Sequence, residues 1–184
     1  MILALDNGLA TLGWAVVRPR TGAVVELGFV ESPTDPVIDD AIDRARRAFD
    51  QAVAVAAIAK RHACRTIVGE AMSFGGPPQA RLAMAVSLGL SWGVLVAVAQ
   101  QTGAEVFAVP PKVWQHSLTG TPDGEPIDYD ALFTALVTLI AAPVRGQLDA
   151  IPKRHRNHAV DAFGIGLHAA RRGAVRIAKG RPTA

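Results

Sequence analysis

The sequence predicts a single α/β domain, with helices packed on a sheet. Its 184 residues make about one domain, and a composition of 50% hydrophobic and 19% charged residues is that of a globular protein, which excludes disordered and collagen-like chains. Short β-type runs fill the first 31 residues, and helical and β-type segments then alternate up to residue 108. The rest of the chain has a helical pattern. This order indicates one sheet covered by helices.

The first 31 residues predict a β-meander. β-type runs at 2–5, 12–17 and 23–30 are separated by Asn7-Gly8 and Thr21-Gly22, dipeptides that favour tight turns. Asp6 therefore stands at the end of the first strand, beside a turn.

A helix is expected from residue 36 to about residue 63. Acidic residues occupy its first turns and basic residues its end, which is the order that the helix dipole favours. They are Asp39, Asp40 and Asp43, and then Lys60, Arg61 and His62. A β-branched run at 66–69 follows and ends in Glu70, and a loop rich in Gly and Pro comes after it at 73–78.

The second half of the chain predicts one long helix, one strand and three shorter helical segments. They lie at 79–101, 104–108, 112–117, 131–141 and 157–172. Neither an internal repeat nor a domain linker is visible, so these elements belong to one domain.

The apolar stretch 82–99 is long enough to cross a membrane, and it contains Gly89-x-x-x-Gly93. Trp92 stands in its middle, however, whereas membrane tryptophans favour the interfaces, and short strands flank the stretch closely. We therefore expect a buried helix lying across a sheet, and no membrane contact. Its small residues also favour close helix approach, so it is the expected dimer interface.

The cysteine content of the chain indicates its cellular compartment, and the distribution of its charges indicates a binding partner. The chain has a single cysteine and opens with apolar residues instead of a basic segment and a cleavage site, so we expect an intracellular protein. The net charge of +3 is unevenly spread, because residues 151–184 hold eight Lys or Arg and one acid. Within this segment, the run Lys153-Arg154-His155-Arg156 precedes an apolar helix and is a candidate phosphate contact.

Four residues form a candidate metal-binding set. Asp6 and Glu70 each end an apolar strand, where an unneutralised charge is costly, and His158 and Asp161 share one helix face at i and i+3. Carboxylate-rich sites suit Mg²⁺ or Mn²⁺, and two such ions stabilise both the entering and the leaving oxygen of a phosphodiester displacement. Taken singly, each residue also has a structural explanation, as a turn residue, a loop cap or a polar residue near a helix start.

In their order along the chain, these motifs resemble the RuvC-type Holliday junction resolvases, in the short form found in phages, within the ribonuclease H superfamily. The resemblance rests on four segments that span residues 1 to about 172. They are Leu3-Ala-Leu-Asp6-Asn-Gly8 with Thr11-x-Gly13-Trp14, Ile67-Val-Gly-Glu70, Pro110-Pro-Lys112-Val-Trp, and His158-x-x-Asp161-Ala162.

The resemblance implies a ribonuclease H-like nuclease domain over residues 1–172, with a mixed five-stranded sheet flanked by helices, and a basic C-terminal tail at 173–184. It implies a homodimer that nicks two opposed strands of a four-way DNA junction in recombination, repair or phage DNA processing. Two Mg²⁺ ions per active site, replaceable by Mn²⁺, are implied as well. The cytoplasm of a bacterium, or of the host cell of a phage, is the implied location.

Site residues carry over position by position. Asp6, Glu70, His158 and Asp161 match the family's catalytic metal ligands. The residues expected to contact DNA are Phe74, which resembles an aromatic that some resolvases insert among junction bases, and the basic residues Lys112, Lys153, Arg154 and Arg156.

Two places depart from the family pattern. Asn7 stands where the family usually has proline. Segment 121–130 carries four acids and no base, where many relatives carry lysines. The basic residues elsewhere would therefore have to supply more of the DNA contact.

Two other functions fit parts of the sequence. An ATP-binding fold of the actin and sugar-kinase type shares the strand-Asp-x-Gly pattern, but it needs two related domains, for which 184 residues leave no room. A non-catalytic ribonuclease H-like protein that binds nucleic acid or regulates transcription stays open. A rise in melting temperature with magnesium would favour the nuclease, because ligand binding stabilises the native state.

Overall fold

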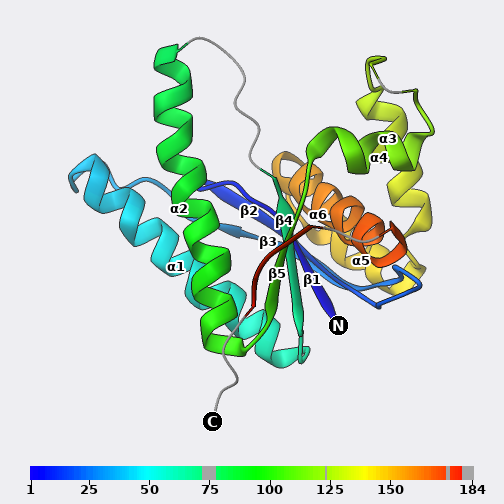
Figure 1. Cartoon of the computed structure of the whole chain (residues 1–184), viewed down its shortest axis with the longest axis horizontal. Helices are drawn as coiled ribbons and strands as arrows, with labels where there is room; N and C mark the ends of the chain where they lie inside the picture. Colours follow the sequence, from blue (N-terminus) through cyan, green and yellow to red (C-terminus); the bar gives the residue numbers. More distant parts are fainter. Residues whose placement is uncertain (72–77, 123, 173–174, 180–184) are drawn as a thin grey trace.

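The computed structural model describes residues 1–71, 78–122, 124–172 and 175–179, in which a six-stranded sheet lies between two layers of helices (Figure 1). This arrangement confirms the predicted α/β class. In chain order the elements are β1 (Ile2–Asp6), β2 (Thr11–Val17), β3 (Val24–Glu31), α1 (Asp40–Arg61), β4 (Thr66–Glu70), α2 (Pro78–Thr102), β5 (Glu105–Val109), α3 (Pro111–Thr119), α4 (Tyr129–Leu139), α5 (Ala142–Ala150), α6 (Lys153–Arg172) and β6 (Val175–Lys179).

The sheet is mixed, as predicted. Its strand order is β3-β2-β1-β4-β5-β6. β4 runs parallel to both of its neighbours, β1 and β5, and the other neighbouring pairs are antiparallel. β1 to β3 form the predicted meander, and β1 to β5 form the expected five-stranded sheet.

Residues 173–184 were predicted to be a basic tail, and the sixth strand corrects this prediction for residues 175–179, the part of that segment that the structure describes. β6 pairs antiparallel with β5, from Glu105↔Lys179 to Ala108↔Val175. An edge strand exposes a row of N–H and C=O groups, and β6 covers that row on β5. The segment Val175–Lys179 therefore belongs to the sheet of the domain.

Helices cover both faces of the sheet over separate hydrophobic cores. α1 and α2 lie on one face, where Leu3 and Leu5 of β1 pack in the same core as Leu95 (Figure 1). On the other face α6 crosses the strands, and Ala4 packs in the same core as Phe163. β1 serves both cores because successive strand residues point to opposite faces.

α1 begins at Asp40 and not at residue 36, because Asp39 caps it. The side chain of Asp39 accepts a hydrogen bond of 3.0 Å from the backbone N–H of Ala41. The last turn contains Lys60 and Arg61, as the dipole argument predicted.

The apolar helix α2 forms as predicted, but it is less buried than predicted. Its window Ala85–Thr102 is long and apolar enough to cross a membrane, and 28% of that window is buried. Residues such as Leu95 and Val98 pack in the core, whereas the N-terminal part of the helix extends beyond the sheet (Figure 1). α2 therefore packs with one side only, and Val86 and Val96 are exposed.

The C-terminal half contains one helix that the sequence analysis missed. α5 has a proline in its first turn, which suits proline, and Gly146 in its interior. These two helix-breaking types concealed its pattern. The last helix, α6, begins at Lys153, four residues earlier than expected, so the basic run 153–156 is the first turn of this helix and not a segment before it.

Candidate active site

Asp6 and Glu70 meet because their strands are parallel neighbours. β1 and β4 pair from Ile2↔Thr66 to Leu5↔Gly69, so both strands end at the same edge of the sheet. Each acid is half-buried and follows a run of buried residues. The structure thus brings together two carboxylates that lie far apart in the sequence.

Gly13 allows α6 to reach this edge. It pairs with Asp6 across β1 and β2, and a Cβ atom on it would lie 2.0 Å from the backbone oxygen of His158. Any side chain at this position would push the helix away from the sheet. The glycine of the Thr11-x-Gly13-Trp14 motif therefore explains how His158 and Asp161 come close to the strand-end acids.

His158 contacts Asp6 directly. Its Nδ1 atom lies 2.6 Å from Oδ2 of Asp6. This hydrogen bond is the main cause that raises the pKa of His158, and burial opposes it. The raised pKa favours the protonated imidazole, which orients Asp6 and compensates its charge.

Glu70 is held by Trp114, a residue to which the sequence analysis gave no role of its own. The indole N–H of Trp114 donates a hydrogen bond of 2.9 Å to Oε1 of Glu70. Trp114 is 1% exposed, and Gly164 of α6 makes room for its ring, since a Cβ atom there would lie 2.7 Å from Cζ3. The available signal was the tryptophan itself, because a buried indole N–H usually has a partner.

Asn7 and Gln51 fix the turn that follows Asp6. Nδ2 of Asn7 donates a hydrogen bond of 3.3 Å to the backbone oxygen of Glu70, a contact that proline cannot make. Nε2 of Gln51, on α1, donates to the backbone oxygens of Gly8 and Leu9, each at 2.9 Å. The departure from proline thus adds a link between the ends of β1 and β4. A single glutamine within a helix gave no sequence signal for the second contact.

Burial and mutual repulsion disfavour the full ionisation of the three carboxylates. Burial, together with the charges of Asp6 and Glu70, raises the pKa of Asp161 to about 7, and His158 opposes this rise. Burial also raises the pKa of Glu70, against the hydrogen bond from Trp114. Acids with perturbed pKa values that gather at one place are typical of functional sites.

Three carboxylates and an imidazole are a donor set that fits Mg²⁺ or Mn²⁺. A divalent cation would neutralise the like charges that raise the pKa of Asp161. Among the described residues, however, no three His, Cys, Asp or Glu side chains stand close enough to enclose an ion. Asp6 is bonded to His158 and Glu70 to Trp114, so ion binding requires some of these side chains to rotate.

The basic residues that were predicted to contact DNA differ in their surroundings. Lys112 and Lys153 are exposed, and within the described part of the chain neither forms an ion pair. Arg154 is exposed too, and its Nη2 lies 3.4 Å from Oε1 of Glu31. Arg156 donates hydrogen bonds of 2.8 and 2.7 Å to two backbone oxygens at the end of α5. Of this set, the two lysines are therefore available to a phosphate, and Arg156 is engaged in the fold.

Two other predicted features are the aromatic Phe74 and the acidic segment 121–130. Phe74 lies outside the described residues. In the acidic segment 121–130, Asp128 caps α4 by accepting a hydrogen bond of 3.0 Å from the backbone N–H of Ala131. At least one acid of this segment thus has a structural role.

Solved structures of Holliday junction resolvases resemble this chain over more than nine-tenths of its length. T. thermophilus RuvC in complex with a Holliday junction substrate has a TM-score of 0.70 and 19% identity, over 96% of this chain and 98% of that chain. The yeast mitochondrial Holliday junction resolvase Ydc2 has a TM-score of 0.58 and 9% identity, over 92% and 78%. The Fowlpox virus resolvase in complex with Holliday junction DNA has a TM-score of 0.52 and 11% identity, over 92% and 98%. No family model matches the sequence, and no curated protein is significantly similar to it. By its structure, the chain has the RuvC-type resolvase fold.

Proposed function

We propose that this protein is a magnesium-dependent endodeoxyribonuclease that resolves four-way (Holliday) DNA junctions by paired nicks. The observation that carries the proposal is the meeting of Asp6, Glu70, His158 and Asp161 at one edge of the sheet of a RuvC-type fold. T. thermophilus RuvC, which shares the fold, has been solved with a Holliday junction substrate. Such an activity would act in recombination, repair or phage DNA processing.

Each residue of the site has a distinct role in this proposal. Asp6, Glu70 and Asp161 would hold the metal, as two Mg²⁺ or Mn²⁺ ions. These ions supply charge neutralisation at the phosphate and acidify a water. His158 would either ligate one of these ions or, in its neutral form with Nδ1–H donating to Asp6, accept a proton from an attacking water through Nε2. Trp114 orients the carboxylate of Glu70.

The decisive experiment is digestion of an end-labelled four-way junction beside a linear duplex of the same sequence, in Mg²⁺, in Mn²⁺ and in EDTA. We expect paired nicks in the junction only, and only with a divalent metal. Asp6→Asn and Glu70→Gln keep the side-chain shape but remove charge, so cleavage should fall by several powers of ten, each about 1.4 kcal/mol of barrier, while junction binding persists. Full cleavage by either variant would contradict the site. Binding by the wild type without cleavage, and without a Mg²⁺-dependent rise in Tm, would favour the non-catalytic alternative.

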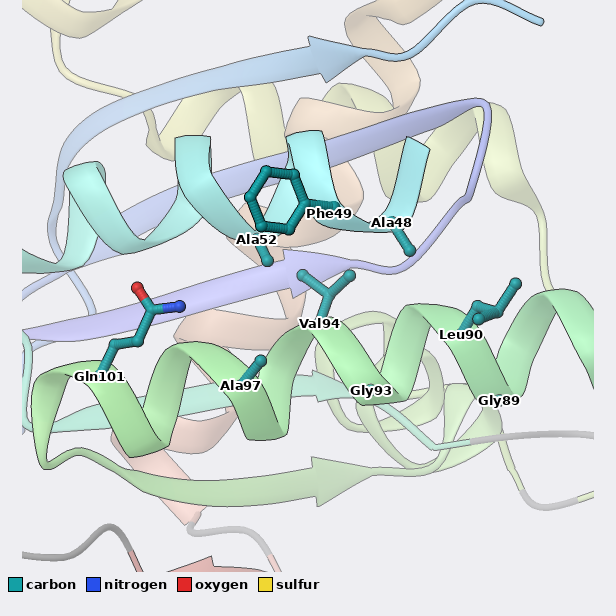
Figure 2. Close-up of a pocket in the computed structure, with 9 residues that line it drawn as sticks. All are labelled: Ala48, Phe49, Ala52, Gly89, Leu90, Gly93, Val94, Ala97 and Gln101. Atoms are coloured by element: carbon teal, nitrogen blue, oxygen red, sulfur yellow. The ribbon is translucent and has the colours of Figure 1, made fainter. Parts of the chain in front are cut away.

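We also propose that the enzyme is a homodimer joined through α1 and α2. Paired nicks need two active sites, so a second copy must be present. The two helices form an apolar groove of about 260 Å³, lined by residues such as Phe49, Gly93 and Val94, whose positions on the facing helices are visible in Figure 2. Phe49 is 68% exposed, and a Cβ atom on Gly93 would meet nothing within 4 Å. Such an open apolar surface favours a protein partner.

The dimer is tested by sedimentation of Phe49→Asp and Gly93→Leu, free and on a junction. Both should be monomers with an unchanged fold, because the two positions are open in the single chain. Leu139→Asp is the matched control, since Leu139 is a 54% exposed apolar residue on α4, away from the groove. If the wild-type protein were monomeric both free and on a junction, the proposed dimer would be wrong. The protein could then only cut one strand of a junction at a time, as a nickase.

A further inference from the structure

A second cavity opens beside the candidate active site. It has a volume of about 280 Å³ and lies between the first turns of α4 and the face of α6 that carries Asp161. Its walls are Tyr129, Asp130, Leu132, Phe133, Asn157 and Asp161. Asn157 precedes Asp161 by one helical turn, so their side chains are neighbours on α6. A ligand in this cavity would therefore lie next to Asp161 and close to the other two acids of the candidate active site, Asp6 and Glu70.

The lining suits a flat and uncharged group, not a phosphate. None of the six lining residues is Lys or Arg, and two of them are acids. The N-terminus of α4, which would otherwise attract an anion, is already capped by Asp128 and followed by Asp130. Tyr129 is 63% exposed, and Phe133 is partly buried against the core beneath. These two rings offer a surface on which a planar ring can stack.

The polar groups at the cavity can distinguish one nucleobase from another. The carboxylate of Asp130 only accepts hydrogen bonds, whereas the amide of Asn157 both donates and accepts. A carboxylate pairs with an exocyclic amino group, as on cytosine N4, and an asparagine pairs with adenine N6 and N7. Adenine, cytosine and guanine carry such an amino group, and thymine does not. Asn157 can donate a hydrogen bond to thymine O4 but Asp130 cannot, so Asp130 is the lining residue that disfavours thymine.

We propose that this cavity receives the nucleobase of the nucleotide adjacent to the scissile phosphate, and that Asp130 selects a base with an exocyclic amino group while Asn157 provides a second polar contact. The inference rests on the proposed nuclease function, because it places the scissile phosphate at Asp6, Glu70 and Asp161. Extruding a base costs least where the base is unpaired, so we expect the cavity to take a base that the bound crossover leaves unpaired. The site would thus set the sequence preference of cleavage.

The test uses the wild-type protein and four variants on a set of four-way junctions that differ only in the nucleotides flanking the crossover, each with A, C, G, T or an abasic nucleotide. Affinity is measured in Ca²⁺ and cleavage in Mg²⁺. Three variants each change one side chain of the cavity lining: Tyr129→Ala, Asp130→Asn and Asn157→Ala. All three residues are exposed and lie outside the buried core, so the fold should be unaffected. Thr134→Ala is the matched control, because it is exposed on the same helix but does not line the cavity.

For the wild type we expect thymine and the abasic nucleotide to be disfavoured at one flanking position, by about tenfold. Asp130→Asn should lose the discrimination against thymine, since its amide N–H can donate to thymine O4. Asn157→Ala should reduce the differences in affinity and cleavage among junctions with the four bases. Tyr129→Ala should lower the affinity for all four junctions by the same factor, because stacking on an aromatic ring does not depend on the identity of the base. Thr134→Ala should behave as the wild type does.

The two proposals fail in different ways. Equal affinity and equal cleavage for all five nucleotides at every flanking position, or a preference that survives both Asp130→Asn and Asn157→Ala, overturns the base-binding cavity and leaves the nuclease intact. Absence of wild-type cleavage on every junction overturns the nuclease. A base preference in binding that is lost in Asp130→Asn would then still support the cavity as a nucleobase site.

Discussion

The indole N–H of Trp114 donates a hydrogen bond of 2.9 Å to the carboxylate of Glu70, which links α3 to the end of β4. The indole is almost fully buried, so it has one orientation, and its donor is directed at one oxygen of the acid. Glu70 is thereby fixed by a residue of α3, whereas Asp6 is held by His158 of α6. The bond from Trp114 joins a residue outside the carboxylate cluster to a proposed metal ligand.

Trp114→Phe should lower the rate of junction cleavage by about tenfold, because a hydrogen bond to a charged group contributes about 1.5–3 kcal/mol and part of it is replaced by water. Single-turnover cleavage in Mg²⁺ measures the effect. Trp92→Phe is the matched control, since the indole nitrogen of Trp92 is buried without a hydrogen-bond partner among the described residues. If both variants lost the same fraction of the cleavage rate and their Tm values fell equally, the hydrogen bond from Trp114 would contribute to stability alone and not to cleavage.

His158→Ala should lower cleavage by about a hundredfold or more, the usual contribution of a positioned proton-transfer group. His158→Asp should keep part of the activity, since a carboxylate is also acceptable to a hard cation. Cleavage rates of both variants in Mg²⁺ and Mn²⁺ measure this. The matched control is His62→Ala, which removes another imidazole–carboxylate contact of 2.6 Å, to Glu26, outside the site. Wild-type rates for His158→Ala would show that this histidine takes no part.

The stability of the metal-free protein should fall as the pH rises from about 4 to about 7. Asp161 has its pKa raised from 3.8 to about 7 in the folded chain, so in this interval the folded state binds more protons than the unfolded state and loses stability with rising pH. Asp161→Asn should reduce this dependence to the part that the raised pKa of Glu70 contributes and, in EDTA at pH 7.5, raise Tm by roughly 2–8 °C, for about 1–2 kcal/mol. The exposed Asp149→Asn is the control. A Tm difference between variant and wild type that is the same at pH 4 and pH 7.5 would contradict the raised pKa.

Among the basic residues, the two exposed lysines and the engaged arginine should behave differently. Replacing both Lys112 and Lys153 by Ala should flatten the salt dependence of junction binding, by roughly 0.9 slope units for each phosphate of the duplex arms that is no longer neutralised. Arg156→Ala should instead lower Tm, because it removes two hydrogen bonds to backbone oxygens at the end of α5. Affinities between 50 and 200 mM salt, in the range where the slope is measured, and melting curves separate the two effects. Lys60→Ala, exposed at the end of α1, is the control, and an unchanged slope in the double variant would exclude both lysines from phosphate binding.

Local pattern was sufficient to predict most of the elements and the four grouped residues. The strand-end positions of Asp6 and Glu70 follow from short apolar runs that stop at an acid, and the shared face of His158 and Asp161 follows from the helical repeat. The elements that were missed have misleading local signals. α5 contains proline and glycine, and β6 lies in a segment whose basic residues resemble a solvated tail.

By itself, the sequence determined the class of fold, the strand-end acids and the histidine–aspartate pair, because these depend on the alternation of apolar and polar residues along a few turns or one strand. Only the tertiary structure decided which partners hold them. That Trp114 binds Glu70, that Gln51 fixes the turn after Asp6, and that Arg156 is engaged at the end of α5 all depend on contacts between separate elements of the fold. Such contacts arise from how the helices pack on the sheet, and a close approach such as that of α6 at Gly13 leaves no periodic trace in the sequence.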